Sequence, residues 1–180
     1  VVGEIPIEAL ASKAPIYSRK WIKKKPRKNT IELKNLKKIK IEDALIKILS
    51  SPNHSNKTWI TNQYDQMVMC DTVQRSGSDA AIIRIHNKDK AIAVSVDSSA
   101  NYCKSYPLTG GKQIVCENWR NLITVGAKPL AITNCLNFGN PENQEVMGEF
   151  AECLEGIKEA CEFLNYPVVS GNVSFYNGTN

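Results

Sequence analysis

Strand-like and helix-like patterns alternate along residues 79–173, and this order excludes all-helical and all-strand folds. Asp79–Ile85 and Ala91–Val96 are apolar runs separated by a turn-rich segment, which is typical of an antiparallel hairpin. Two helix patterns follow, and each leads into a buried-strand pattern, at residues 128–138 and 168–173. The order strand, strand, helix, strand, helix, strand predicts an α/β (α+β) sandwich with the helices on one face of the sheet.

Both helices carry end signals. The first is predicted to open at Gly110-Gly111, to keep one face apolar, and to end at Gly126. The second is predicted to begin after Asn140-Pro141, a cap residue followed by a proline that suits a first turn. Asn165-Tyr166-Pro167 breaks it. Its core face comprises Met147, Phe150, Ala151, Leu154, Ile157, Cys161 and Leu164.

Ahead of this domain the sequence predicts a tail and a linker. Residues 1–18 include the strand-like stretch Gly3–Ile7 and are interpreted as the tail of a preceding domain. Residues 19–57 are interpreted as a basic linker with a short helix at Ile41–Ser50, and residues 58–180 as the α/β domain. Because the chain opens without methionine and stops amid domain signals, we expect it to be a piece of a longer protein.

Positive charge is concentrated in the linker. Arg19–Lys40 holds eleven Lys and Arg and one acid, Glu32, whereas the whole chain carries +5. Such a run is a candidate nucleic-acid arm, because Lys and Arg release counterions from phosphate backbones, but a solvated linker has the same composition. Trp21 is its one aromatic residue, so it lacks the stacking residues of single-strand binders, and we expect a linker. Loss of salt-dependent polyanion binding on deletion of residues 19–40 would favour the arm.

Several classes of protein are disfavoured by what the sequence lacks. It has no run of about 18 apolar residues and no signal-peptide pattern, so we expect no membrane span and no export. The six cysteines form no Cys-x-x-Cys pair, which predicts buried or free thiols in a reducing cytoplasm rather than a zinc site or a disulfide framework. His54 and His86 are expected to be exposed and suggest no catalytic triad.

Polar residues occupy the ends of the two later strand patterns. Asn134 and Asn137 follow residues 130–133, and Gly171–Ser174 follows residues 167–170. Burying amides and hydroxyls is costly unless they are hydrogen-bonded, so these residues indicate either a hydrogen-bonded turn or a ligand site. A glycine would let a phosphate approach the backbone, and amide and hydroxyl oxygens suit Mg²⁺ or a ribose phosphate.

These residues belong to a series of blocks that resembles the phosphoribosylformylglycinamidine synthases of purine biosynthesis. The resemblance spans residues 59–177 and is most specific at Leu136–Pro141 and Gly171–Ser174. Residues 1–18 resemble the end of that family's first half, so we expect this chain to be the start of the second half and to be inactive alone. The further blocks are, in order, Trp59–Asp65, Gly77–Ala81, Gly110–Lys112, Arg120–Leu122, Val125–Ala131 and Pro167–Asn177.

The resemblance implies a PurM-like N-terminal domain, which has a mixed four-stranded sheet with helices on one face. In that family the sheets of two such domains pair into a closed barrel. A chain without its partner half would expose the sheet face, so we expect self-association. The family's other partners are a glutaminase subunit and a small accessory subunit.

The resemblance also implies a ligase that uses ATP, Mg²⁺ and glutamine-derived ammonia to convert formylglycinamide ribonucleotide (FGAR) to the amidine. Asn134 and Gly171 would bind ATP, Asn172 would ligate Mg²⁺, and Ser174 would touch the phosphoribosyl group. Asn134 stands where many relatives have Asp, which removes a charge from the nucleotide site. The general-base histidine belongs to the family's first half, so no catalytic residue is assigned to this chain.

Two alternatives stay open. Aminoimidazole ribonucleotide synthetase, thiamine-monophosphate kinase and selenophosphate synthetase share the implied fold, but Leu136–Pro141 and the tail at residues 1–18 match the synthase better. The alternative outside enzymes is a nucleic-acid-binding or scaffold protein with a basic arm that has kept the fold.

Overall fold

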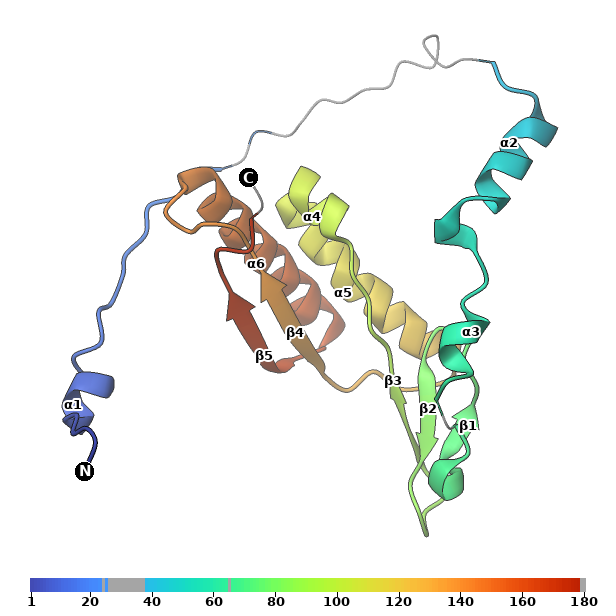
Figure 1. The fold of residues 1–180 in the computed structure, drawn as a ribbon, viewed down its shortest axis with the longest axis horizontal. Coiled ribbons are helices and arrows are strands. Elements are labelled where there is room, and N and C mark those ends of the chain that lie inside the picture. The colour runs from blue at the N-terminus through green and yellow to red at the C-terminus, as the bar shows by residue number, and fades with distance from the viewer. Residues whose placement is uncertain (24, 26–37, 65, 179–180) are drawn as a thin grey trace.

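The computed structural model describes residues 1–23, 25, 38–64 and 66–178. Two long helices, α5 (Pro107–Thr124) and α6 (Gln144–Leu164), lie side by side (Figure 1). They cover one face of a parallel pair of strands, β4 (Ile132–Asn137) and β5 (Val168–Ser174). The predicted α/β class is confirmed, and so is the order of its elements from the hairpin onward.

The predicted hairpin is present. Strands β2 (Ala81–Arg84) and β3 (Ala91–Val94) pair in antiparallel register, and β1 (Thr72–Gln74) joins the other edge of β2. The strands therefore form a three-stranded antiparallel sheet and a separate two-stranded parallel sheet, rather than one mixed four-stranded sheet. Strand β3 is not paired with β4, and a pocket separates β3 from residues 126–131, which lead into β4.

Helix α5 begins three residues earlier than predicted, because Pro107 has the fixed φ that suits a first helical turn. Gly110 and Gly111 are therefore inside the helix and buried. A β-carbon on Gly110 would meet the Cys103 backbone, and one on Gly111 would meet the Cys153 carbonyl. These glycines let neighbouring helices approach closely, instead of opening the helix.

Helix α6 also differs from its prediction at one end. It begins at Gln144, because the side-chain oxygen of Asn143 accepts hydrogen bonds from the backbone N–H of Glu145 (2.9 Å) and Val146 (3.4 Å). The predicted end is confirmed, since Asn165 adopts the left-handed conformation with φ 49° directly after Leu164. A β-carbon on Gly156 would meet the Leu108 carbonyl of α5, so this glycine sets the close packing of the two helices.

The core lies between these helices and strand β4. It includes Val115 of α5, Leu136 of β4, Ile157 of α6 and Tyr166, which is 2% exposed. Asn118 sits on the predicted apolar face of α5 and is buried with its amide fully used. It accepts a hydrogen bond from the Tyr166 hydroxyl at 2.7 Å.

The same asparagine connects α5 to the end of β3. Its Nδ2 donates to Asp97 Oδ2 at 2.8 Å and to the Ser95 carbonyl at 3.2 Å. Asn121 Nδ2 donates to the other carboxylate oxygen of Asp97 at 2.6 Å. Burial of these polar groups is tolerated because each is hydrogen-bonded.

The segment before the domain differs from its prediction. Gly3–Ile7 is not a strand; instead a short helix, α1 (Ile7–Leu10), begins after Pro6, with Ala9 N donating to the Pro6 carbonyl at 2.9 Å. The predicted helix at Ile41–Ser50 is confirmed as α2 (Ile41–Leu49). Short helices follow at α3 (Thr58–Thr61) and α4 (Ala100–Ser105), with single 3₁₀ turns at η2 (Pro52–His54) and η3 (Val68–Cys70).

Residues 24 and 26–37 of the predicted basic linker, including Glu32, lie outside the described residues. Its described beginning contacts the domain, since Ile22 N donates to the Gln144 carbonyl at 3.2 Å and Arg19 lies 3.8 Å from the Glu142 carboxylate. Gly148 of α6 leaves room for the Ile22 carbonyl. Within the described part of the chain, the helices are too short or too polar to cross a lipid bilayer.

Candidate functional site

The candidate site residues share one pair of strands. In the parallel register of β4 and β5, Asn134 lies opposite Gly171, Cys135 opposite Asn172, and Asn137 opposite Ser174. All four residues predicted to bind ligands are therefore brought together, although they come from sequence blocks more than thirty residues apart. Strand β4 is shorter than the predicted 128–138 and β5 ends one residue after the predicted 168–173, so Asn134 and Gly171 lie within the strands.

Asn134 and Gly171 form a tight cross-strand contact. A β-carbon on Gly171 would collide with the Asn134 side-chain oxygen, so a glycine is needed opposite this asparagine. Asn134 is half-buried and alternates with buried Leu136, which places it on the helix-covered face. A shallow groove at this pair has a volume of about 470 Å³. Its lining includes apolar residues such as Leu136 and Phe150 and also Asn134, Gly171 and Asn172.

Asn172 and Ser174 lie on the opposite, open face of the sheet. Side chains alternate along a strand, and partners in a parallel ladder point to the same side, so Asn172 shares this face with Cys135, and Ser174 with Asn137. Cys135 and Asn137 are both exposed, as expected for residues on the open face. Asn137 Nδ2 lies 3.3 Å from Cys135 Sγ. The structure thus divides the predicted site between two faces of the sheet.

The open face is polar. Besides Cys135 and Asn137 it carries Thr133 and Ser170, which are register partners. Strand β5 was predicted to be buried, but residues 168–173 are exposed. Within the described residues nothing pairs with the free edge of β5, and on the helix side the groove leaves Val173 50% exposed. Parallel sheets are normally apolar and covered on both faces, so this polar open face departs from the usual pattern and is a candidate ligand surface.

The open face offers limited ligands for a divalent cation. Asn172 provides an amide oxygen, and within the described residues no cluster of three His, Cys, Asp or Glu could hold a metal ion. Mg²⁺ often binds proteins through one or two side chains while phosphates and water supply the other oxygens. Asn172 therefore fits as one ligand of a nucleotide-bound Mg²⁺, not as part of a protein-only cage.

Asn137 and Asn177 are two further polar residues of this region. The sequence indicated that Asn137 belongs to a turn or a ligand site but gave it no role, and it gave Asn177 none. Asn137 lies directly opposite Ser174. Asn177 follows the end of β5, and its side-chain Nδ2 donates to Ser174 Oγ at 3.0 Å. Both fall inside sequence blocks of the family resemblance, but the contact with Ser174 requires the folded turn.

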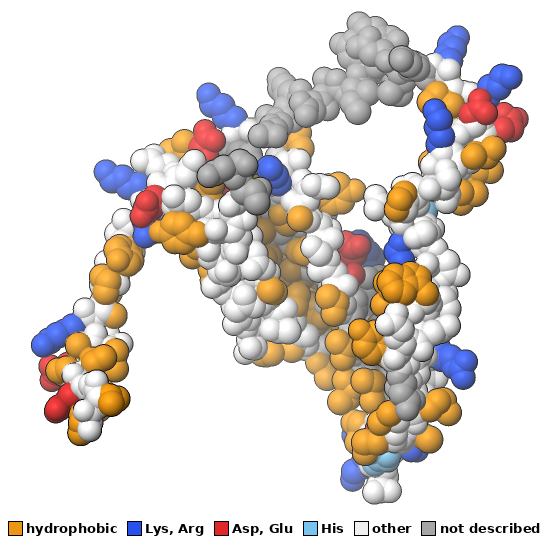
Figure 2. Space-filling view, viewed as in Figure 1, with side chains coloured by type: hydrophobic (Ala, Val, Ile, Leu, Met, Phe, Trp, Pro, Cys, Tyr) orange, Lys and Arg blue, Asp and Glu red, His pale blue; other side chains and the backbone are white. Residues whose placement is uncertain are grey.

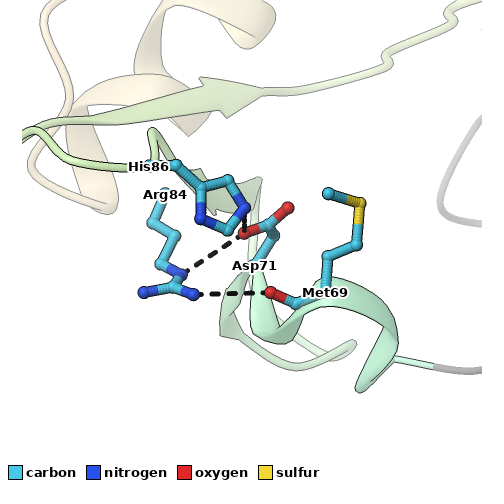
Figure 3. Close-up of polar contacts among 4 residues, drawn as sticks. All are labelled: Met69, Asp71, Arg84 and His86. Atoms are coloured by element: carbon cyan, nitrogen blue, oxygen red, sulfur yellow. Dashed lines mark hydrogen bonds and ion pairs between the residues drawn. The ribbon is translucent and has the colours of Figure 1, made fainter.

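A second polar cluster lies on the antiparallel sheet (Figure 3). Asp71 Oδ1 is 2.7 Å from His86 Nε2 and 3.3 Å from Arg84 Nε, and Arg84 also donates to the Met69 carbonyl at 3.4 Å. The predicted exposure of His54 and His86 is confirmed. Arg84 and His86 are about half exposed. Their contacts with Asp71 connect the β2–β3 hairpin to the segment before β1.

All six cysteines are thiols in the structure, and Cys153 and Cys161 are buried. The hydrogen bond with the Cys153 thiol lowers the pKa of Cys103 to about 7. The same bond, together with burial, raises the pKa of Cys153. The Cys103 thiol is therefore the more acidic of this pair, which lies between α4 and α6 and away from the β4–β5 face.

This chain is similar in sequence to curated proteins and in structure to solved ones. The phosphoribosylformylglycinamidine synthase subunit PurL of Pelagibacter ubique is 58% identical over 99% of this chain, which spans 24% of that relative. The Thermotoga maritima PurL structure in complex with ATP shares 36% identity and a TM-score of 0.62, over 70% of this chain and 21% of the other. The one in complex with FGAR shares 39% identity and a TM-score of 0.58, over 68% and 20%.

The chain thus spans about a quarter of the length of the curated relatives that it matches. The family described as AIR synthase related protein, N-terminal domain, matches residues 77–180. That range includes the β2–β3 hairpin, both long helices and the β4–β5 pair with all four candidate site residues. The chain therefore belongs to the AIR synthase related protein family, through its N-terminal domain.

Proposed function

We propose that this chain is part of a phosphoribosylformylglycinamidine synthase and provides the first α/β domain of the second half of that enzyme. Residues 1–18 would be the tail of the preceding domain, residues 19–57 the linker and residues 58–180 the domain itself. The reaction joins ammonia to FGAR at the expense of ATP, in the cytoplasm, with a glutaminase subunit and a small accessory subunit as partners. The proposal rests on the names of the relatives and on the four candidate site residues that strands β4 and β5 bring together.

The single observation that carries the proposal is the register of β4 and β5. It brings Asn134, Gly171, Asn172 and Ser174 onto adjacent strands. Asn134 and Gly171 would bind ATP, Asn172 would ligate Mg²⁺, and Ser174 would contact the phosphoribosyl group of FGAR. The relatives solved with ATP and with FGAR support both ligand classes.

In this proposal the chain contributes binding and orientation. Gly171 lacks a side chain, so a ligand can approach its backbone, and Asn134 offers a neutral amide beside it. Bound Mg²⁺ would neutralise the charge that develops during phosphoryl transfer. The Ser174 hydroxyl would donate a hydrogen bond to a phosphate oxygen of FGAR. No acid or base for the reaction is assigned to this chain.

The test is a chimera in which this chain replaces the matching segment of the Pelagibacter ubique subunit. Ammonia-dependent ADP release is measured with FGAR, ATP and Mg²⁺, and we expect activity that Asn172→Ala or Ser174→Ala strongly reduces. Ser170→Ala is the matched control, because it is the same change on the same face of β5 but outside the proposed site. A folded chimera without activity, or full activity in both site variants, would overturn the proposal.

We also propose that the isolated chain self-associates through its antiparallel sheet. Ile83 and Ile92 are cross-strand partners, are 45% and 55% exposed, and lie on the same face. Hydrophobic side chains gather over this end of the molecule (Figure 2). An apolar sheet face of this kind is stabilised when another copy covers it.

Sedimentation of the isolated chain over a range of concentrations tests this association. We expect dimers that Ile92→Glu dissociates. Phe163→Glu, at an 89% exposed position on α6, is the control for the loss of an exposed apolar side chain elsewhere. A strictly monomeric profile at high concentration would refute the association.

A further inference from the structure

The turn after β5 is fastened to the turn after β4. The backbone N–H groups of Tyr176 and Asn177 donate to the carbonyls of Gly139 and Phe138, both at 3.0 Å. Tyr176 has a φ of 63°, a left-handed conformation that costs energy for a residue other than glycine. These bonds offset that cost, and the turn brings Asn177 back over the end of β5.

The Asn177 side-chain amide makes its two shortest hydrogen bonds to Ser174. Its Nδ2 lies 2.9 Å from the Ser174 carbonyl and 3.0 Å from Ser174 Oγ, with a weaker contact of 3.4 Å to the Phe138 carbonyl. An amide NH₂ group can only donate, so Ser174 Oγ is the acceptor of this bond. The Ser174 hydroxyl hydrogen must therefore point elsewhere.

The direction left to that hydrogen is away from the described protein. Among the described residues the Ser174 hydroxyl donates no hydrogen bond, and its one side-chain bond is the one that it accepts from Asn177. Ser174 is half-buried on the open face of the sheet, opposite Asn137. A hydroxyl that accepts from an amide on one side and faces an open surface on the other is prepared to donate to a ligand.

We propose that Asn177 is a positioning residue that holds the Ser174 hydroxyl as a donor toward an anionic oxygen of a phosphate ester. The inference rests on the proposed function, in which Ser174 contacts the phosphoribosyl group of FGAR. Phosphate oxygens only accept hydrogen bonds, and bonds to a charged acceptor are stronger than neutral ones. Without Asn177 the hydroxyl would rotate freely, and part of the binding energy would be spent on orienting it.

The experiment measures KM for FGAR and for ATP separately in the active chimera. Asn177→Ala is expected to raise KM for FGAR about five- to tenfold, the value of one neutral hydrogen bond, and to leave KM for ATP within about twofold. Asn177→Asp is expected to raise KM for FGAR further. Its carboxylate would accept the Ser174 hydrogen and withdraw it from the ligand.

Asn140→Asp is the matched charge control. Asn140 lies in the neighbouring turn, and its side-chain oxygen accepts from Glu142 N at 2.8 Å, a bond that aspartate retains. The variant adds the same charge at the same edge of the sheet without touching Ser174. An equal rise in KM for Asn140→Asp and Asn177→Asp would mean that charge alone is responsible and would overturn the inference.

A double-mutant cycle separates positioning from general support of the turn. In a Ser174→Ala background, Asn177→Ala is expected to change KM for FGAR by less than about twofold, because the hydroxyl it orients is gone. An undiminished effect would overturn the positioning role while leaving the proposed function standing. If Ser174→Ala itself leaves KM for FGAR unchanged, the proposed contact of Ser174 fails, and this inference fails with it.

Discussion

The side-chain oxygen of Asn134 occupies the space that a β-carbon on Gly171 would need. The two residues are direct partners in the parallel ladder of β4 and β5. An asparagine on the helix-covered face of a strand would ordinarily compete with apolar side chains for space. The missing side chain opposite it provides that space, so the pair is best regarded as one unit.

The variant Gly171→Ala tests this unit. The added methyl group must displace Asn134 or separate the strands, so we expect a loss of about 1–3 kcal/mol in the free energy of unfolding. Chemical denaturation of the chain measures it. Adding Asn134→Ala to this variant should restore part of the loss, because it removes the colliding side-chain atoms, whereas the Asn134 carbonyl oxygen, 2.8 Å from the added β-carbon, remains.

Gly178→Ala is the control for that experiment. A β-carbon on Gly178 would lie 3.9 Å from its nearest neighbour, which is an ordinary contact. We expect a change below about 0.5 kcal/mol. Equal losses for the two alanine variants would show that backbone freedom, and not the contact with Asn134, is the reason for the glycine.

Removal of the Tyr166 hydroxyl should weaken the junction of the three elements that meet at Asn118. Tyr166→Phe leaves the buried side-chain oxygen of Asn118 without its 2.7 Å partner, and we expect a loss of about 1–3 kcal/mol. Tyr102→Phe, at a 61% exposed position on α4, should change stability by less than about 0.5 kcal/mol. Thermal unfolding of both variants checks the prediction, and equal melting temperatures would contradict it.

The alkylation of Cys103 should follow its lowered pKa. The hydrogen bond with Cys153 stabilises the thiolate of Cys103 and lowers its pKa to about 7, so the reactive form accumulates as pH rises through 7. Iodoacetamide labelling, resolved by peptide mass, should show a midpoint near pH 7 for this residue. In Cys153→Ala the midpoint should move to higher pH; an unchanged midpoint would rule out the Cys153 bond as the cause.

The Asp71 cluster should contribute little to stability and should respond to salt. Its partners are about half exposed, so Asp71→Asn is expected to cost less than about 1 kcal/mol at low ionic strength. The difference between variant and parent should shrink in about 0.5 M salt, where exposed charges are screened. If the loss of stability does not change with salt, the charges of the cluster are not its cause, and a changed backbone at Met69–Asp71 would explain it instead.

The sequence predicted the helices and the hairpin well, because their signals are local. The end of α6 at Leu164 follows from Asn165, which tolerates the left-handed conformation that ends a helix. The predicted starts of α5 and α6 were wrong, because more than one residue near each start can begin a helix. Gly110-Gly111 resembles a helix boundary, but packing against Cys103 and Cys153 requires these glycines inside the helix.

Other features could not be predicted because they depend on tertiary contacts. Helix α4 has no apolar periodicity of its own and packs its backbone against Gly110. The division of the strands into two sheets depends on the spacing between β3 and β4, which no local pattern encodes. The family resemblance supplied Asn134, Gly171, Asn172 and Ser174 as candidates, but not their arrangement, which depends on strand register.

The alternation along β5 makes the site more sensitive to chain length than to side-chain chemistry. Gly171 and Asn172 are neighbours in sequence but serve opposite faces of the sheet. Deletion of a single residue upstream within β5 would exchange the two sets of side chains, placing Asn172 against Asn134 and Gly171 on the open face, and an insertion would place Ser170 against Asn134. The ladder already absorbs one extra residue on β5, between the pairs Ile132–Val168 and Thr133–Ser170, so a change of length is tolerated near the start of this strand but not next to Gly171.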